Sequence, residues 1–531
     1  MCGITASIAL PRRKVDEHTA ITHTNGINGA NGINGINSTN GINGTNGING
    51  INGTNGINGH AVGHTTEVLT TQLQASIDTI NHRGPDESGI WISPDASIGL
   101  GHCRLAINDL SPSGTQPLTS DYGQNESTTE VLTTQLQASI DTINHRGPDE
   151  SGIWISPDAS IGLGHCRLAI NDLSPSGTQP LTSDDGQIHA VVNGEIYDHD
   201  RLRDVCTTEH GYKFNGESDS ELVVALYKIH GAPAFFEHLR GEFAFVLHDN
   251  REASKRVIAG RDRFGIKPLV WTVVGGRLLM AAEAKAFRPM GWEPEWDVGA
   301  IVDSGWMMDE RTLFKGVRKL LPGHWMEVSE EQGIKTRKYW DAEYEDKTRV
   351  ETRTIDEMVL GVRERLVESI RLRLRADVPV GVYLSGGIDS SAVAGIVTQL
   401  AKEKHVKIGN QAASTRVACF SVRFPAESGY DESSVAERTA EWLGVEVIKK
   451  DVDEASLARD FADTAYHCEH HHFDLNCVAK FALSTLPRDH GVKVVLTGEG
   501  ADEHFSGYPY FTPDFLREPE LFAARQRLRA A

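Results

Sequence analysis

The chain has 531 residues and a formal net charge of −21. This balance argues against nucleic acid as a partner, because binding phosphates needs a basic face. No apolar run reaches the length that a bilayer demands, so we expect no membrane span or membrane partner. The length allows two to four domains. The seven cysteines include no CxxC pair, and residues 1–5 are not a signal peptide, so we expect a reduced, cytoplasmic protein.

Two segments differ from ordinary globular sequence. Residues 24–60 consist largely of Asn-Gly pairs, which favour turns and cannot build a core, so we interpret them as a disordered low-complexity tract. Residues 65–121 recur letter for letter as residues 128–184, whereas true repeat proteins stack similar but non-identical units. We therefore expect 61–127 to be a surplus copy. The second copy is the one expected to fold, because it runs directly into the next predicted strand.

Outside these segments, the first half alternates apolar and polar residues in short runs. We assign residues 1–23 and 128–300 to one domain, and we expect 301–350 to connect it to the next, with strand character near 325–328. Strands without regular intervening helices predict an antiparallel α+β fold. The predicted strands are 189–197, 242–249, 255–261, 268–274 and 277–282, and a helix is predicted over 220–230.

The second half, residues 351–531, alternates predicted helices and strands. This order implies a parallel sheet whose ligands lie at the carboxyl ends of the strands. The predicted strands are 378–384, 417–424, 445–451 and 492–496, and the predicted helices are 356–376, 391–403, 433–443 and two more before the last strand.

A glycine-rich loop follows the first of these strands and reads Ser385-Gly386-Gly387-Ile388-Asp389-Ser390-Ser391. Two glycines let backbone N–H groups approach an anion, and the hydroxyls and helix N-terminus add donors. The loop lacks the lysine of a Walker P-loop. An aspartate within such a loop suits a Mg²⁺ ion bound to phosphates.

A second, acidic loop follows the last predicted strand and reads Thr497-Gly498-Glu499-Gly500-Ala501-Asp502-Glu503. Three carboxylates so close together would repel one another without a cation or a base role. Asp502 can share Mg²⁺ with Asp389, and Glu499 can act as a general base on an amine. On its own, the loop could equally be a solvated acidic turn. The nearby cluster His467–His472 fits no standard zinc spacing, so a polar helix end is the preferred interpretation.

Cys2 directly follows Met1. Removal of Met1 would leave the α-amine of Cys2 free to act as the base for its own thiol, which is the N-terminal nucleophile arrangement. Position alone is weak support, because an early cysteine also occurs by chance. Further motifs follow in chain order and strengthen the functional interpretation: HRGPD at 145–149, RLAI at 167–170, NGEIY at 193–197, Ser218-Asp219 and RDRFGIKPL at 261–269.

With these motifs and the two loops, the chain resembles the glutamine-hydrolysing asparagine synthetases, which are class II amidotransferases. The resemblance implies an N-terminal-nucleophile glutaminase domain of antiparallel sheets, followed by part of an α/β synthetase domain of the ATP-pyrophosphatase type. It implies glutamine, aspartate and ATP as substrates, with Mg²⁺. Ammonia released at Cys2 would pass through an internal tunnel and attack a β-aspartyl-AMP intermediate. A homodimer is compatible with this reading.

In the glutaminase half, the resemblance implies that Cys2 attacks the glutamine amide. Arg167 would hold the α-carboxylate, Asn193 and Gly194 would form the oxyanion hole, and Glu195 and Asp219 would accept hydrogen bonds from the α-amine.

In the synthetase half, the resemblance implies contacts from Leu384 and Val422 to adenosine. The 385–391 loop would bind pyrophosphate. Thr497 and Gly498 would add ATP contacts, and Asp389 and Asp502 would bind Mg²⁺.

The sequence also departs from the family. It ends soon after Glu503, without the lysine and the R-x-P-F-L-D segment that family members carry, so we expect a synthetase cleft that lacks one wall. Two alternatives therefore stay open. One is a related ligase of secondary metabolism that amidates another acid. The other is a chain that hydrolyses glutamine only, or has no activity.

Overall fold

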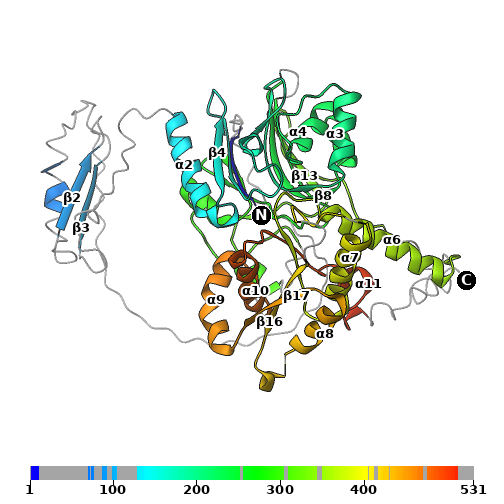
Figure 1. Cartoon of the computed structure of the whole chain (residues 1–531). Coiled ribbons are helices and arrows are strands. Elements are labelled where there is room, and N and C mark those ends of the chain that lie inside the picture. The colour runs from blue at the N-terminus through cyan, green and yellow to red at the C-terminus, as the bar shows by residue number, and fades with distance from the viewer. Residues whose placement is uncertain are drawn as a thin grey trace, which may run out of the picture. The chain divides into compact units, whose positions relative to one another are not determined.

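A computed structural model describes the chain over residues 2–10, 70–71, 73–76, 87–92, 99–104, 128–251, 255–303, 309–343, 350–404, 406–411, 416–429, 431–470 and 475–511. The chain forms two units, Met1–Arg12 with Thr128–Ala531, and Arg13–Ser127. Figure 1 shows the elements of both. The low-complexity tract lies outside the described residues. Within the described part, no helix is long and apolar enough to cross a bilayer.

The first sheet of the larger unit places the N-terminal strand near its middle. Its order is β12-β10-β11-β1-β5-β4, and all its neighbouring strands are antiparallel. Gly3 lies opposite Cys166, where a Cβ on Gly3 would meet the Cys166 Sγ at 2.5 Å. A larger residue at position 3, beside Cys2, would therefore have to displace the side chains of Cys166 and Ile143. The strands are β1 (Gly3–Ala9), β4 (Glu150–Ile155), β5 (Ile161–Arg167), β10 (Val270–Val274), β11 (Arg277–Ala281) and β12 (Arg318–Lys319).

The second sheet is also antiparallel, in the order β14-β13-β9-β8-β7-β6. Successive side chains of its long central strands point to opposite faces, and both faces are buried, so these side chains enter two different cores in turn. The strands are β6 (Leu181–Thr182), β7 (Ile188–Ile196), β8 (Gly241–Asp249), β9 (Arg256–Arg261), β13 (His324–Ser329) and β14 (Gly333–Lys338).

The two sheets pack face to face, and helices cover their outer faces (Figure 1). One buried cluster joins β1, β5 and β11 of the first sheet to β8, β9 and β13 of the second. α2 (Thr128–Thr142) and the 3₁₀ segment η6 (Ala284–Met290) pack on the first sheet. α3 (His199–Thr208) and α4 (Glu221–His230) pack on the second. The result is a helix–sheet–sheet–helix sandwich.

The region 301–350 differs from its expected role as a connection. β12 extends the first sheet, and β13 and β14 extend the second, so residues 318–338 belong to the sandwich. Trp325, Met326 and Val328 are buried in its cores. The sequence pattern indicated only a short strand here, because half of β14 is exposed and Ile334 is its one apolar side chain.

The second half contains a four-stranded parallel sheet in the order β17-β16-β15-β18. α6, α7 and α8 share one buried cluster with it, and α10 packs on the other side. The strand order reverses at β15, because β16 and β17 follow on one side of it and β18 lies on the other. Open α/β sheets bind ligands at such a switch point, beyond the carboxyl ends of the strands. The elements are α6 (Ile355–Arg373), β15 (Val380–Tyr383), α7 (Ile388–Lys404), β16 (Ala418–Arg423), α8 (Ser433–Leu443), β17 (Glu446–Asp451), α9 (Glu454–Cys468), α10 (Asn476–Asp489), β18 (Val494–Leu496) and α11 (Ala501–Phe505).

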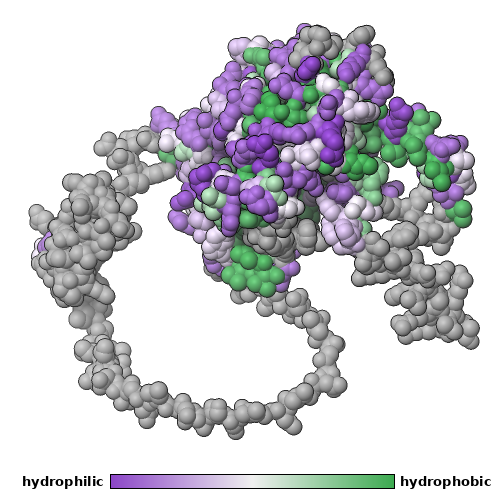
Figure 2. Space-filling model, turned by 60° about the horizontal axis from the view of Figure 1, so that its bottom comes forward, coloured by the Kyte–Doolittle hydropathy of each residue, from purple (hydrophilic) through white to green (hydrophobic). Residues whose placement is uncertain are grey.

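α6 starts with a capping box, in which Thr354 accepts from the Glu357 backbone and the Glu357 side chain reaches back. One side of this helix leaves Ile355, Val359 and Leu360 exposed. Apolar surface of this kind appears in green among the purple, hydrophilic residues in Figure 2.

The first copy of the duplicated segment, in the smaller unit, forms β2 (Glu87–Ile92) and β3 (Gly99–Arg104). Their register, Glu87 opposite Arg104, repeats that of Glu150 opposite Arg167 in the second copy. In the described residues, β3 pairs with β2 alone, whereas β5 also pairs with β1. The predicted fold class, an α+β domain of antiparallel sheets followed by an α/β domain with a parallel sheet, is confirmed.

Candidate functional site

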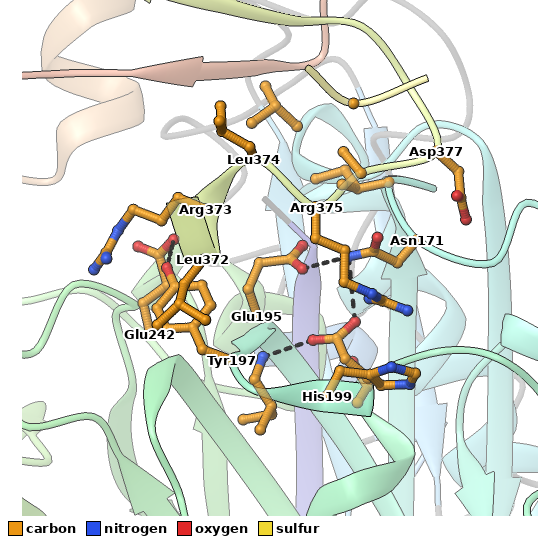
Figure 3. Close-up of a pocket in the computed structure, with 18 of the residues that line it drawn as sticks. Asn171, Glu195, Tyr197, His199, Glu242, Leu372, Arg373, Leu374, Arg375 and Asp377 are labelled. Carbon is orange, nitrogen blue, oxygen red and sulfur yellow. Dashed lines mark hydrogen bonds between the residues drawn. The ribbon is translucent and has the colours of Figure 1, made fainter. Parts of the chain in front are cut away.

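A cavity of about 920 Å³ brings all of the predicted glutamine-site residues together. Its lining comes from the loops at the ends of β1, β5 and β7, from residues 371–377 before β15, and from β18. Figure 3 shows part of this lining. The predicted residues that line it are Cys2, Arg167, Asn193, Gly194, Glu195, Asp219 and Thr497.

Cys2 lies half-buried at the start of β1. Its Sγ accepts a hydrogen bond from the Leu168 N–H at 3.3 Å, and its carbonyl oxygen accepts one from Arg146 Nε at 3.2 Å. Burial raises the pKa of the Cys2 thiol, and the nearby Glu195 carboxylate acts in the same direction. The positive N-terminus and the Leu168 contact act in the opposite direction. The thiol is therefore mainly neutral at neutral pH and needs a base to become a nucleophile.

Asn193 and Gly194 lie in β7 on the wall of the same cavity. Among the described residues, neither polar side-chain atom of the buried Asn193 has a hydrogen-bond partner. Such orphaned groups cost about 1–3 kcal/mol each unless a ligand satisfies them. A Cβ on Gly194 would approach Phe243 Cα to 2.6 Å, so the backbone at this position requires glycine. The side-chain N–H of Asn193 is thus available to an oxygen atom of a ligand.

Two carboxyl groups, Glu195 and Asp219, share one amide. Asn171 Nδ2 donates to Glu195 Oε2 at 2.6 Å and to Asp219 Oδ1 at 3.4 Å. Figure 3 marks the contact between Asn171 and Glu195 with a dashed line. Asp219 Oδ2 accepts the Ile196 N–H at 2.6 Å. Burial raises the pKa of both acids, and Asp219 further raises that of Glu195. In the described residues, neither carboxyl group forms an ion pair, so the pair suits a positively charged group of a ligand.

Arg167 reaches the cavity wall, but its guanidinium already has partners. Its Nη1 lies 2.7 Å from Glu150 Oε2 and 3.0 Å from the Ser174 carbonyl oxygen, and Nη2 contacts the Asp172 carbonyl oxygen. The side chain is 4% exposed. A substrate carboxylate at Arg167 would therefore share the guanidinium with Glu150.

Residues 373–377, here called the joining segment, tie the end of α6 to the glutamine-site loops. The Asp377 carboxylate accepts the Asp172 N–H at 2.8 Å, and the Asp377 N–H donates to the Ile170 carbonyl at 2.9 Å. Arg375 Nη2 lies 3.3 Å from the Glu217 carbonyl oxygen, and the Arg373 guanidinium lies 4.6 Å from the centre of the Tyr197 ring. The same segment leads directly into β15.

The two loops predicted to bind ATP lie against each other. A Cβ on Gly498 would come within 2.9 Å of both the Asp389 Cβ and the Ser390 backbone nitrogen. In the first loop, the Ser385 and Ser390 hydroxyls are 3.0 Å apart. Gly386 adopts a φ of +94°, a conformation that favours glycine.

Other predicted contacts of these loops fall at the same edge of the sheet. The Ser391 Oγ is buried without a partner among the described residues, and Gly387 N–H donates to Ser385 Oγ at 3.4 Å. Leu384 is buried at the end of β15, and Val422 lies near the end of β16. The edge thus presents hydroxyls, backbone N–H groups and apolar side chains.

The acidic residues of the second loop have different surroundings. Glu499 forms an exposed ion pair with Lys480 at 2.8 Å. Asp502 lies in the first turn of α11, and Asp389 lies in the first turn of α7. The two carboxylates therefore belong to the two loops that lie against each other. Carboxylate oxygens are suitable ligands for Mg²⁺. In the described residues, no group of three or more His, Cys, Asp or Glu side chains could hold a metal, and this includes the described part of the His467–His472 cluster.

Sequence reasoning did not identify Asn171, Glu150 or Asp377 as part of this site. Asn171 and Asp377 occur in the motifs RLAIND and RADVPV, but their partners lie far away in the sequence. Lys493, just before β18, was also missed, and its Nζ lies 2.7 Å from Asp149 Oδ2 of the HRGPD motif.

Comparison with protein families finds two matching models. A glutamine amidotransferase domain model matches residues 54–128 and 123–340, and an asparagine synthase model matches residues 361–531. The first match therefore covers both copies of the duplicated segment. β1, which follows Cys2, lies outside these ranges and joins the second copy through its pairing with β5.

Three curated relatives match over most of the chain. Amidase chyE of Penicillium rubens is 48% identical over 405 residues, which is 76% of this chain and 59% of the relative. Amidase chry2 of Gibberella zeae is 48% identical over 388 residues, which is 73% of this chain and 57% of the relative. Asparagine synthetase [glutamine-hydrolyzing] 1 of Bacillus subtilis is 33% identical over 381 residues, which is 71% of this chain and 55% of the relative.

The chain thus spans less than two thirds of the length of each of these relatives. The two family models nevertheless match consecutive parts of it, in the order of the two domains seen in the structure. The chain belongs to the asparagine synthetase family.

Proposed function

We propose that this protein hydrolyses glutamine and uses the released ammonia to amidate a carboxylic acid that ATP has activated. One observation carries the proposal: Cys2, the unpartnered Asn193 amide and the Glu195–Asp219 pair line one cavity, whose wall also includes Thr497 of the second loop. A thiol, an oxyanion donor and an acidic recess are the groups that hydrolysis of an amino-acid amide requires.

In the first half-reaction, removal of Met1 frees the α-amine of Cys2, which accepts the thiol proton. The sulfur attacks the glutamine amide carbon, and the amide N–H of Asn193 with the backbone N–H of Gly194 stabilises the negative oxygen. The proton passes to the leaving nitrogen, so that ammonia departs and a glutamyl thioester remains. Water then hydrolyses the thioester to glutamate and regenerates the thiol.

Glutamine would be held at its α-carbon. The α-ammonium lies at Glu195 and Asp219, where positive charge offsets the repulsion between two buried acids. The α-carboxylate meets the guanidinium of Arg167, which is suited to planar anions. Its neighbour Glu150 then shifts its hydrogen bonding toward Thr178, whose hydroxyl already donates to it at 2.6 Å.

In the second half-reaction, an acid carboxylate attacks the α-phosphorus of ATP and pyrophosphate leaves, giving an acyl adenylate. Residues 385–391, with Thr497 and Gly498, would hold the phosphates, and Leu384 and Val422 would contact the adenosine. Asp389 and Asp502 would hold Mg²⁺, which neutralises phosphate charge when bound. Ammonia then attacks the acyl carbon, Glu499 accepts the excess proton, and AMP departs.

The first candidate acid is aspartate, whose β-carboxylate would give asparagine. Similarity to asparagine synthetases at 33% identity supports it. The second candidate is a different acid, and the two relatives named amidases, at 48% identity, favour that choice.

The test supplies glutamine, ATP, Mg²⁺ and one acid at a time, and follows glutamate, pyrophosphate and product mass. We expect glutamate release that depends on Cys2, with pyrophosphate appearing only when the correct acid is present. Glutamate release that is unchanged in Cys2→Ala would refute the nucleophile, and absence of pyrophosphate with every acid would limit the activity to glutamine hydrolysis.

A further inference from the structure

The Glu195–Asp219 pair is organised by a neutral side chain. We propose that Asn171 is a positioning residue that makes the glutamine site selective for amides carrying an α-ammonium group. The inference rests on the proposed function of this site and adds a specificity determinant to it.

Asn171 fixes the orientation of both carboxylates. Its Nδ2 carries two N–H groups, and the two acceptors are Glu195 Oε2 at 2.6 Å and Asp219 Oδ1 at 3.4 Å. The second oxygen of Asp219 is already held by the Ile196 N–H. Figure 3 shows Asn171 and Glu195 pointing toward each other across the cavity wall. Each carboxylate therefore keeps one defined orientation before any ligand arrives.

An amide orients the two acids without neutralising them. A lysine or arginine at position 171 would supply a counter-charge and remove the attraction for a ligand cation. Within the described residues, neither Glu195 nor Asp219 forms an ion pair, although Lys267 and Arg375 lie close enough to favour their charged forms. Glu242 adds further negative charge near Glu195. The missing positive charge is what an α-ammonium supplies.

The backbone on both sides of Asn171 is anchored. The Ile170 carbonyl and the Asp172 N–H both bond to Asp377 of the joining segment, at 2.9 and 2.8 Å. The Asn171 side chain thus projects from a held turn, as preorganised recognition requires. With its backbone held in this way, the Asn171 amide positions both carboxylates relative to each other.

The experiment measures binding by calorimetry in the Cys2→Ala protein, so that turnover does not interfere. The ligands are glutamine and glutaramate, which is glutamine without its α-amino group. Asn171→Leu keeps the branched shape of the side chain and removes the donor, and Asn171→Gln keeps an amide. Asn215→Leu is the matched control, because Asn215 is an exposed amide whose Nδ2 bonds the Thr182 carbonyl outside the cavity.

We expect Asn171→Leu to weaken glutamine binding about tenfold and to leave glutaramate binding unchanged, because hydrogen bonds to charged groups are the strong ones. Asn171→Gln should recover part of the loss, and Asn215→Leu should change neither ligand. An equal loss for both ligands, or no loss for glutamine, would overturn the inference. A different result is that the protein that retains Cys2 binds glutamine in preference to glutaramate but releases no glutamate. That result would refute the proposed hydrolysis and leave the inference standing.

Discussion

The carboxylate of Asp377 accepts a hydrogen bond from the backbone N–H of Asp172 at 2.8 Å, and this contact joins the two halves of the molecule at the glutamine site. Asp377 precedes β15, which leads into the 385–391 loop, while Asp172 follows Asn171. One residue therefore fixes the turn beside the acid pair and the start of the strand that carries the nucleotide loop.

Asp377→Ala should raise the KM for glutamine about fivefold, because the loss of about 1 kcal/mol of hydrogen bonding loosens the Asn171 turn. The value of kcat for glutamate release should change little, because Cys2 keeps its contacts to Leu168 and Arg146 and Asn193 keeps its place in β7. Steady-state kinetics check this prediction. The matched control is Asp341→Ala, which removes an exposed ion pair with Lys338 and an exposed hydrogen bond from the Ala342 N–H, both outside the cavity. An unchanged KM in the Asp377 variant would show that this contact does not hold the site.

Cys2→Ala should abolish glutamate release, while Cys468→Ala should retain it, since Cys468 is exposed on α9 and away from the cavity. Because burial raises the pKa of the Cys2 thiol, alkylation of Cys2 by iodoacetamide at pH 8 should be slower than that of free cysteine and should accelerate as the pH rises. Mass spectrometry of the N-terminal peptide follows the reaction. Alkylation faster than that of free cysteine would instead indicate a preformed thiolate.

Glu195→Gln should stabilise the protein without ligand and abolish glutamine binding. The pKa values of Glu195 and Asp219 are raised by folding, so the folded state holds these protons more readily than the unfolded state. Stability is therefore lost as the pH rises above the usual carboxyl range, at about 4, toward neutrality. The Glu195→Gln substitution removes one of the two carboxyl groups and therefore part of this loss of stability.

The expected gain for Glu195→Gln at pH 7 is a few degrees in Tm, since about 1 kcal/mol corresponds to about 2–4 °C in a domain of this size. The gain should shrink as the pH falls through about 4 and vanish below it, where both carboxyls become protonated in the unfolded state as well. Thermal melting against pH checks this, with the exposed Glu237→Gln as control. A gain that does not depend on pH would mean that the pair carries no charge penalty.

Gly498→Ala should abolish ATP-dependent pyrophosphate release and leave glutamine hydrolysis intact. The added methyl group would press on Asp389 and Ser390 at 2.9 Å and separate the two loops. Gly395→Ala, within α7, is the matched control, because the nearest atom to a Cβ at position 395 is Leu443 Cδ2 of α8, at 3.8 Å. Full pyrophosphate release by Gly498→Ala would show that contact between the loops is not required.

Much of the fold could be predicted because the signals are local. Period-two alternation marked β7 to β11, and the alternation of helices and strands marked the parallel sheet. The loop at 385–391 is a contiguous motif, and its strand–loop–helix context is readable from the sequence alone. The region around β12 and β14 could not be assigned, because its strands are short or exposed and their place depends on partners far away in the chain.

The candidate site was predictable only in its motif residues. The sequence named Glu195 and Asp219, but the amide between them comes from Asn171, and that contact exists only once β5, β7 and the turn before α4 are assembled. Similarly, the partner of Arg167 is Glu150 on the paired strand β4, and the partner of Glu499 is Lys480 on α10. Such pairings follow from sheet register and helix packing.

The central claim is that nitrogen released at Cys2 reaches an acid activated by ATP. The most direct measurement supplies glutamine carrying heavy nitrogen in its amide, together with ATP, Mg²⁺ and candidate acids, and identifies the products by mass spectrometry. We predict an amide product that carries the label, formed with an equal amount of AMP and lost in Cys2→Ala. Labelled ammonia in solution as the sole nitrogen product, with no AMP formed from any acid, would contradict the claim.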